Sequence, residues 1–297
     1  FEIKNKLESS RIKCLFFLGD VTRKSFIGKV FEENKIDIVF HAAAYKHVPL
    51  VEINPLQGIF NNVFSTLEIC KASESNGVKQ ILLVSTDKAV RPTNVMGASK
   101  RLAELIIQAY AQKTNFTTYS MVRFGNVLGS SGSVVPTFQT QINAGGPITV
   151  THPDVLRYFM TISEAVQLVI QSVEFAHGGD LFLLDMGAPI PIRELANQMI
   201  YLSGLKPVDK DNPDGDIEIK YTGLRPGEKL YEELLINAES LPTDNEYIYR
   251  AKEKNIPYEI LIPKVHLLEK LIKKNESSEV FKLLSELVPE WNRENLK

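Results

Sequence analysis

The sequence predicts an α/β protein built on a doubly wound parallel sheet, with a smaller C-terminal substrate-binding region. Short runs rich in Ile, Val, Leu and Phe recur at residues 12–18, 36–40, 80–85 and 118–124. Amphipathic helical patterns separate them. Continuous apolar strands that alternate with helices are typical of a parallel sheet covered on both faces.

Each predicted strand ends in small or polar residues: Gly19-Asp20, His41 to Ala44, Ser85 to Asp87 and Gly125-Asn126. Small residues also permit tight turns between strands and helices. In doubly wound sheets, however, ligands bind beyond the carboxyl ends of the strands. Because four such ends occur together, we interpret them as the border of one ligand-binding crevice.

The pattern loosens after residue 125. Helices are expected near 134–144 and 162–176, a strand at 180–187, a solvated loop at 207–216, and two amphipathic helices from about 262 that separate near Asn275-Glu276. We therefore expect a cofactor domain made of residues 1–125 and 162–186, and a substrate region made of residues 126–161 and 187–297.

Composition excludes several classes of protein. The 297 residues are 44% hydrophobic and 24% charged, with a formal charge of −2, so the basic field of a nucleic-acid-binding protein is absent. No apolar run approaches the ~20 residues of a membrane span. Cys14 and Cys70 lie in apolar surroundings, which suits free thiols in the reducing cytoplasm.

The segment STDKAVRPTNVMGASKR, residues 85–101, joins a strand end to a helix start. A joint role for Thr86, Asp87 and Lys88 requires that the strand has already ended, because strand neighbours point to opposite faces. Thr93 or Asn94 is the expected N-cap of the following helix. Met96 and Lys100 are four residues apart and hence share one face of that helix, with Lys100 directed toward the crevice.

A Ser or Thr at this strand end, followed by Tyr-x-x-x-Lys on the next helix, builds the hydride-transfer site of extended short-chain dehydrogenases. This sequence resembles that family, but Met96 stands at the tyrosine position. Methionine cannot take a proton, and Met96 by itself is best interpreted as a packing residue. Asp87 and Lys88 instead supply two titratable groups.

Six ordered segments resemble CapD-like polysaccharide biosynthesis proteins, over nearly all of the chain up to about residue 240. They are HAAAYKHVPLVEINP, STDKAVRPTNVMGASKR, VRFGNVLGSSGSVVP, RYFMTISEAVQL, LLDMGAPIPIRELA and GLRPGEKLYEEL. Within that family the similarity is greatest to the large UDP-N-acetylglucosamine 4,6-dehydratases, which retain configuration at C5. The smaller C5-inverting dehydratases are similar too, although many of them carry the tyrosine.

The resemblance implies a Rossmann-like fold and a redox-neutral lyase that uses NAD. Lys88 is then the base at C5, and Asp87 the acid at the leaving C6 oxygen, which requires Asp87 to be buried. Thr86 would bind the C4 hydroxyl, and Lys100 the nicotinamide ribose. The Lys100 cation and the oxidised nicotinamide are expected to depress the pKa of Lys88 from its usual value of about 10.4. Met96 cannot remove the C4 hydroxyl proton. Asp87, or a water held by Thr86, is therefore expected to remove it.

The resemblance also implies binding residues. Those expected at the cofactor are Asp20, Val21, His41, Ala42, Ala43, Ala44 and Lys100, and those expected at the UDP-sugar are Lys46, Asn126, Arg157, Arg225 and Glu228. His47 is interpreted as structural. The segment 225–228 also fits a helix start with Pro226 at its first position, and this can hold together with a binding role. The histidines and cysteines lack metal-ligand spacing, so no metal is expected.

A dinucleotide site needs a glycine-rich turn after its first strand, and none precedes Asp20. The family carries that turn upstream. We therefore expect a chain that is truncated at its N-terminus and binds NAD poorly, with residues 1–9 in a helix. The family further implies membrane helices before the catalytic domain, which would anchor it to the inner face of the membrane, and a homo-oligomer.

Three other functions remain open at this stage. A C4 epimerase also cycles a hydride at C4, but it needs the tyrosine and lacks the Asp-Lys pair. A C5-inverting dehydratase would share most of the motifs. A catalytically silent nucleotide-sugar-binding protein would fit Met96 and the missing glycine turn.

Overall fold

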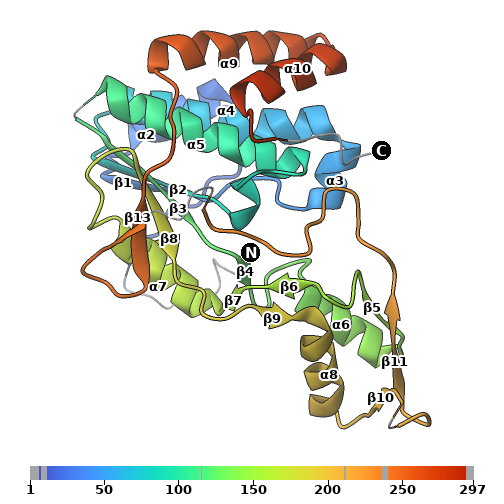
Figure 1. Ribbon diagram of the computed structural model, residues 1–297. Helices are drawn as coiled ribbons and strands as arrows, with labels where there is room; N and C mark the ends of the chain where they lie inside the picture. Colours follow the sequence, from blue (N-terminus) through green and yellow to red (C-terminus); the bar gives the residue numbers. More distant parts are fainter. Residues whose placement is uncertain (1–6, 8–11, 115, 211, 236–239, 292–297) are drawn as a thin grey trace.

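The computed structural model describes residues 7, 12–114, 116–210, 212–235 and 240–291. Over these ranges, the larger lobe is built on a six-stranded sheet in the order β1-β2-β3-β8-β13-β12 (Figure 1). The first four strands are parallel; β13 is antiparallel to β8, and β12 is antiparallel to β13. Their bounds are Ile38–His41 (β1), Gln80–Val84 (β2), Thr118–Arg123 (β3), Asp180–Leu184 (β8), Ile248–Ala251 (β13) and Ser240–Pro242 (β12). The predicted fold class is confirmed.

Helices cover both faces of this sheet (Figure 1). On one face lie α2 (Lys24–Glu33), α3 (Val48–Ile53), α4 (Pro55–Ser75) and α5 (Val95–Lys113), with α9 (Tyr258–Lys273) and α10 (Ser277–Leu287) stacked outside them. Helix α7 (Ile162–Ser172) covers the other face. No helix in the described ranges is both long and apolar enough to cross a bilayer.

The strands contribute side chains to two separate hydrophobic cores, because successive side chains point to opposite faces of the sheet. In β2, Ile81 and Leu83 join the core beneath α4 and α5, whereas Leu82 joins the core beneath α7. In β3, Met121 and Val122 divide in the same way. Burial on both faces explains why the runs read as continuously apolar.

The smaller lobe has its own core. Helices α6 (Val134–Asn143) and α8 (Ile192–Leu202) pack on a parallel sheet in the order β10-β11-β5. The strand bounds are Pro207–Val208 (β10), Ile217–Tyr221 (β11) and Ile148–Val150 (β5). Two short ladders accompany it: β4 (Asn126–Val127) with β7 (Phe159–Met160), and β6 (Leu156–Arg157) with β9 (Ile190–Pro191).

Helix α5 begins where its capping residue predicts. The Asn94 side chain accepts a hydrogen bond from the Gly97 amide at 2.8 Å, so it satisfies a backbone donor that has no partner within the helix. A Cβ atom at Gly97 would overlap the Lys88 carbonyl. The first turn of α5 therefore packs directly on the 3-10 turn η1 (Asp87–Ala89).

The strand expected at residues 12–18 is wrong. This segment forms no ladder, and four consecutive apolar side chains, Leu15 to Leu18, are each more than half exposed. A strand needs a neighbour for its backbone hydrogen bonds, and among the described residues β1 pairs only with β2. The helix expected at residues 1–9 lies, apart from Leu7, outside the described ranges.

The structure also departs from the expected division of the C-terminal third. Residues 187–297 were expected in the substrate region, but β12, β13, α9 and α10 belong to the large lobe. Leu261, Val265 and Leu268 of α9 are fully buried in the core that α4 and α5 share. Amphipathic pattern predicted these helices correctly, but it could not say which apolar surface they would cover.

The buried face of α5 should be the most sensitive part of the large lobe. Ile106 is completely buried, whereas Ile260 on α9 is 53% exposed. We expect Ile106→Ala to lower the free energy of unfolding by about 2–5 kcal/mol, because it leaves a cavity, and Ile260→Ala to lower it by less than about 0.5 kcal/mol. Urea unfolding followed by circular dichroism measures both, and equal losses would contradict this account of the core.

Candidate active site

A cavity of about 610 Å³ lies where β1, β2 and β3 end at their carboxyl termini, facing the smaller lobe. Its walls come from the segments after these strands, from α5 and α6, and from the loop that follows β11. This is where ligands bind in doubly wound sheets. The crevice predicted from the strand ends is therefore present, although Gly19-Asp20 does not border it.

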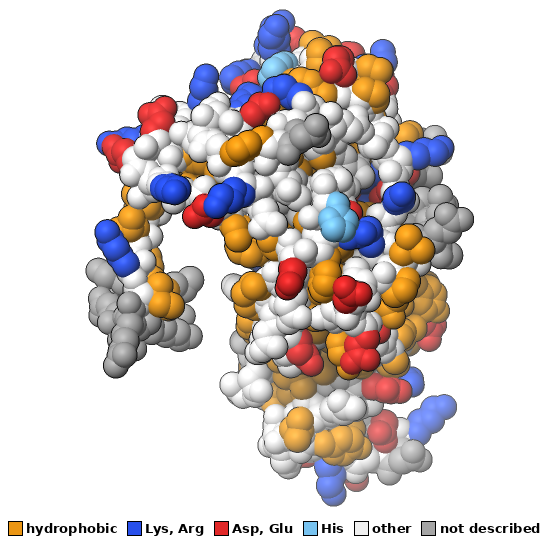
Figure 2. All heavy atoms as spheres, turned by 90° about the vertical axis from the view of Figure 1, so that its left-hand side faces the viewer, with side chains coloured by type: hydrophobic (Ala, Val, Ile, Leu, Met, Phe, Trp, Pro, Cys, Tyr) orange, Lys and Arg blue, Asp and Glu red, His pale blue; other side chains and the backbone are white. Residues whose placement is uncertain are grey.

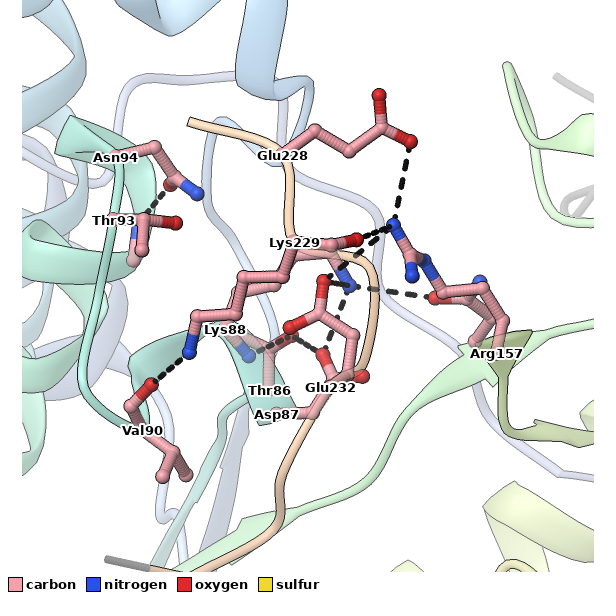
Figure 3. Close-up of polar contacts among 12 residues, drawn as sticks. Thr86, Asp87, Lys88, Val90, Thr93, Asn94, Arg157, Glu228, Lys229 and Glu232 are labelled. Carbon is pink, nitrogen blue, oxygen red and sulfur yellow. Dashed lines mark hydrogen bonds and ion pairs between the residues drawn. The ribbon is translucent and has the colours of Figure 1, made fainter. Parts of the chain in front are cut away.

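Thr86, Asp87 and Lys88 leave the sheet together, because β2 ends at Val84 and η1 turns the chain. One Asp87 carboxyl oxygen, Oδ1, accepts hydrogen bonds from Thr86 Oγ1 at 2.8 Å and from Lys88 Nζ at 2.9 Å (Figure 3). Thr86 and Lys88 line the cavity, whereas Asp87 is 0% exposed and does not. Asp87 therefore reaches the cavity only through its two neighbours.

Lys88 lies between two carboxyl groups. Its Nζ is 2.9 Å from Asp87 Oδ1 and 3.8 Å from Glu232 Oε1, and it also donates to Asn126 Oδ1 at 3.4 Å. Burial by itself would lower the pKa of Lys88, but the charges of Asp87 and Glu232 outweigh it and raise the pKa. The expected depression is therefore corrected: carboxylates, and not Lys100, dominate its surroundings.

Met96 and Lys100 both line the cavity from α5, as their spacing predicts. The Lys100 ammonium donates to the Val84 carbonyl at 2.7 Å, and burial lowers its pKa to about 8. Met96, which the sequence analysis placed at the tyrosine position, is 3% exposed. This wall therefore has a cation but no proton-transferring phenol.

The loop after β11 is fastened to both lobes. Lys229 Nζ donates to the Val90 carbonyl at 2.8 Å (Figure 3). Thr93 Oγ1 donates to the Gly227 carbonyl at 2.7 Å. Arg157 donates to the Lys229 carbonyl at 2.8 Å. The guanidinium that was expected to clamp UDP thus already holds this loop.

The expected helix start at residues 225–228 is wrong. The segment forms a turn in which the Glu228 amide donates to the Arg225 carbonyl at 3.0 Å. The Glu228 carboxylate accepts from Thr151 at 2.9 Å and from Arg157 at 3.3 Å. Arg225 is exposed and lines the cavity, so its charge is available to a ligand.

The residues expected at the cofactor fall into two groups. Ala42 and Ala44 line the cavity. His41 turns toward α4, with Nε2 3.2 Å from Thr66 Oγ1, and burial lowers its pKa to about 3, so the ring is neutral. Asp20 is exposed and accepts hydrogen bonds from Thr22.

Val21 packs on the large core, and neither it nor Ala43 lines the cavity. The small side chains of Ala42 and Ala44, together with the Lys100 ammonium, suit the nicotinamide half of a dinucleotide. On the substrate side, Lys46 and Asn126 line the cavity as expected. His47 lines it too, against Gly132.

Sequence reasoning missed Glu232, which is 7% exposed and lines the cavity. It lies within the segment GLRPGEKLYEEL, so the signal was present. What the sequence could not show is which of the adjacent glutamates faces inward. Glu233 is exposed and pairs with Arg91 at 3.1 Å.

Sequence reasoning also missed a buried ionic network behind the triplet. Glu104 on α5 accepts from Arg123 Nη2 at 2.6 Å, from Arg101 Nη1 at 3.0 Å and from Ser85 Oγ at 2.6 Å. Arg123 also bonds Glu253 at 2.7 Å. Burial would raise the pKa of Glu104, but the arginines outweigh it and lower the pKa to about 2.

Among the described residues no group of three or more histidine, cysteine or acidic side chains could hold a metal ion.

The model of the family described as polysaccharide biosynthesis protein matches residues 1–253 of this chain. The capsular polysaccharide biosynthesis protein CapD of Staphylococcus aureus is 49% identical over 84% of this chain, which spans only 40% of the length of CapD. A UDP-glucose 4-epimerase of Rickettsia conorii is 36% identical over 82% of this chain and 69% of its own length.

Solved structures have the same fold. Pen from Bacillus thuringiensis superposes with a TM-score of 0.75 at 32% identity, over 87% of this chain and 76% of Pen. The UDP-glucose 4-epimerase of Thermus thermophilus in complex with NAD has a TM-score of 0.62 at 20% identity, over 72% of this chain and 73% of that protein. The second likeness shows the fold alone.

Removing the central charge of the buried network should destabilise the protein. Glu104→Gln leaves Arg101 and Arg123 with Glu253 as the one carboxylate they share among the described residues, and we expect a loss of about 3–5 kcal/mol. Since the folded-state pKa is lowered to about 2, the contribution of Glu104 is present above its ordinary pKa of 4.5 and is lost as the pH falls from there toward 2.

Urea unfolding at several pH values checks this expectation. The wild type should lose more stability than Glu104→Gln as the pH falls through that window. Glu286→Gln is the matched control, because Glu286 is 49% exposed and pairs with Lys264 at 3.5 Å on the surface. Parallel pH curves for the wild type and Glu104→Gln would contradict the assignment.

Proposed function

Because this chain belongs to the polysaccharide biosynthesis protein family, within the extended short-chain dehydrogenases, we propose that it is a nucleotide-sugar 4,6-dehydratase. The proposed reaction converts UDP-N-acetylglucosamine to a UDP-2-acetamido-2,6-dideoxy-4-hexulose with bound NAD, for surface polysaccharide or glycoprotein glycan synthesis. The observation that carries the proposal is that Thr86 and Lys88 line one cavity together with Met96 and Lys100, while the buried Asp87 accepts hydrogen bonds from both Thr86 and Lys88.

NAD fits one side of the cavity. Ala42 and Ala44 would let it approach the backbone, and Lys100 would hold its ribose. Bound NAD would supply a hydride acceptor for C4 and a hydride donor for C6. The Lys100 cation, which burial makes easier to deprotonate, would also favour negative charge on neighbouring oxygens.

The C4 hydroxyl proton has a short path into the protein. Thr86 Oγ1 faces the cavity and donates to Asp87 Oδ1 at 2.8 Å. We propose that Thr86 accepts the C4 proton as it passes its own proton to Asp87. The phenol that Met96 lacks is thereby replaced by a hydroxyl backed by a buried carboxylate.

Lys88 is the proposed base at C5. The ketone at C4 would acidify the C5 proton, and the Lys88 amine lines the cavity where it could remove that proton. Since Asp87 and Glu232 raise its pKa, Lys88 starts as a cation and must first release a proton to a neighbour. Protonation of Asp87 in the previous step weakens the attraction that keeps Lys88 charged.

The UDP moiety is proposed to lie along the smaller lobe. Arg225 and Lys46 supply cations, and Asn126 supplies an amide for the diphosphate oxygens. Arg157 and Glu228 would act indirectly, because their side chains fix the loop that carries Arg225.

A C4 epimerase is the second candidate, favoured by the similarity to the epimerase of Rickettsia conorii. It shares hydride transfer at C4, but it needs neither the Asp87-Lys88 pair nor the loss of C6 oxygen. Both candidates predict NADH formation, so the fate of C5 and C6 must separate them.

Incubation with UDP-N-acetylglucosamine in heavy water tests the proposal. We expect the NAD-bound protein to yield a product that has lost one water and gained deuterium at C5, as measured by mass spectrometry and NMR. Unchanged mass with inversion at C4 would favour the epimerase. Recovery of unaltered substrate that nonetheless binds would favour a silent nucleotide-sugar-binding protein.

The proton path through Asp87 can be tested separately. Asp87→Asn should slow the first formation of NADH by about 10²-fold or more in a single turnover, because the C4 hydroxyl loses its base. Asp154→Asn, at a carboxylate that is 70% exposed, is the control and should react as the wild type does. Full-rate NADH formation in Asp87→Asn would refute this path.

A further inference from the structure

We propose that Glu232 is a catalytic residue of this site, the carboxyl group that protonates the C6 oxygen of the sugar as it leaves. The inference rests on the function proposed above. It deepens that function by assigning the acid of the elimination step, which Asp87 is poorly placed to supply.

Glu232 has the position that such an acid needs. Its side chain is 4% exposed and lines the cavity, with Oε1 3.8 Å from Lys88 Nζ and 3.9 Å from Arg157 Nη2. Its second oxygen, Oε2, is buried and has no hydrogen-bond partner within the described part of the chain. A buried carboxyl oxygen without a partner is costly, and a sugar hydroxyl entering the cavity could satisfy it.

The other acidic side chains of this loop are committed elsewhere. Glu228 accepts hydrogen bonds from Thr151 and Arg157 and from the Arg225 amide. Glu233 lies on the surface with Arg91. Of the three glutamates at 228, 232 and 233, Glu232 is the one that is buried at the cavity with an oxygen left over.

Asp87 and Glu232 reach the same Lys88 amine from different segments of the chain (Figure 3). Asp87 also has a buried oxygen, Oδ2, without a hydrogen-bond partner among the described residues, but its side chain is fully buried and does not line the cavity. Glu232 comes from the loop after β11 and borders the cavity itself. A proton on Asp87 can reach the sugar only through Thr86 or Lys88. A proton on Glu232 can reach it directly.

The surroundings of Glu232 favour proton uptake. Burial raises its pKa, while Lys88, Arg157 and Lys229 oppose this effect; the charge of Asp87 also raises the pKa of Glu232, but only until Asp87 is protonated. Once Asp87 has received the C4 proton, Lys88 loses its closest carboxylate partner. Lys88 can then pass a proton to Glu232 and become the neutral amine that C5 requires.

The protons balance over the cycle. Asp87 gains the C4 hydroxyl proton through Thr86, and Lys88 gives one proton to Glu232. Neutral Lys88 removes the C5 proton as the C6–O bond breaks and Glu232 protonates the departing oxygen, which leaves as water. Lys88 returns a proton to C5 when C6 receives the hydride, and Asp87 then reprotonates Lys88. Together, Asp87, Lys88 and Glu232 gain one proton from the C4 hydroxyl and lose one in the departing water, so each returns to its starting protonation state.

Glu232→Gln tests the assignment by separating the two halves of the reaction. We expect the variant to bind UDP-N-acetylglucosamine and to form NADH at nearly the wild-type rate, because Thr86 and Asp87 are intact. Dehydration and deuterium uptake at C5 should fall by about 10²-fold or more. Stopped-flow absorbance of NADH and mass spectrometry of the products in heavy water measure the two halves.

Two further variants serve as controls for Glu232→Gln. Glu233→Gln removes the adjacent surface carboxylate and should behave as the wild type does. Glu232→Asp restores a carboxyl group and should recover part of the dehydration that Glu232→Gln loses. A structural role alone would instead slow NADH formation and dehydration together.

The outcomes distinguish this inference from the proposed function. Wild-type dehydration in Glu232→Gln, or an equal loss of both halves, would overturn the role of Glu232 while leaving the dehydratase proposal intact. A wild-type protein that forms no dehydrated product would overturn the proposed function itself, and this inference with it.

Discussion

The junction at the end of β2 depends on one buried carboxylate. Glu104 holds Arg101 of its own helix, Arg123 of β3 and Ser85 at the strand end, and Arg123 extends the network to Glu253. The network thereby fixes α5, β3 and the segment that carries Glu253 around Ser85, the residue that precedes Thr86, Asp87 and Lys88. A charge that is buried and fully paired tolerates little displacement, because moving any partner leaves another uncompensated. Thr86, Asp87 and Lys88 begin on this rigid base.

The sequence predicted what depends on local pattern. The strands near 36–40, 80–85 and 118–124, the Asn94 cap and the shared face of Met96 and Lys100 are all present in the structure. It failed where a partner distant in sequence decides. Residues 12–18 have the composition of a strand but no adjacent strand in the described ranges, and α9 covers α5 and not the smaller lobe.

The same limit explains the errors at the site. The pKa of Lys88 was expected to fall because the positive charges of Lys100 and the cofactor were considered without the negative charge of the adjacent Asp87. Glu232, 144 residues further along the chain, reverses that expectation together with Asp87. Glu104 on α5 fits a polar position of an amphipathic helix, and only the fold brings Arg123 to it. The pKa of a charged group depends on the charges that lie near it in the fold, and sequence pattern does not show which distant residues those are.

Fastening the β11 loop to α5 has a mechanical consequence. Gly227 has a positive φ of 74°, its carbonyl accepts from Asn94 Nδ2 at 3.1 Å, and a Cβ there would lie 2.7 Å from the Cβ of Asn94. Figure 2 shows the molecule from the left-hand side of Figure 1, with the smaller lobe below the larger one. Asn94 is also the residue that caps α5. The loop that carries Glu232 thus also contacts the residue that caps α5. A displacement of this loop would move the carboxyl group of Glu232 and remove a neighbour from the first turn of α5 at the same time, so the position of that carboxyl group and the order of the helix start are coupled.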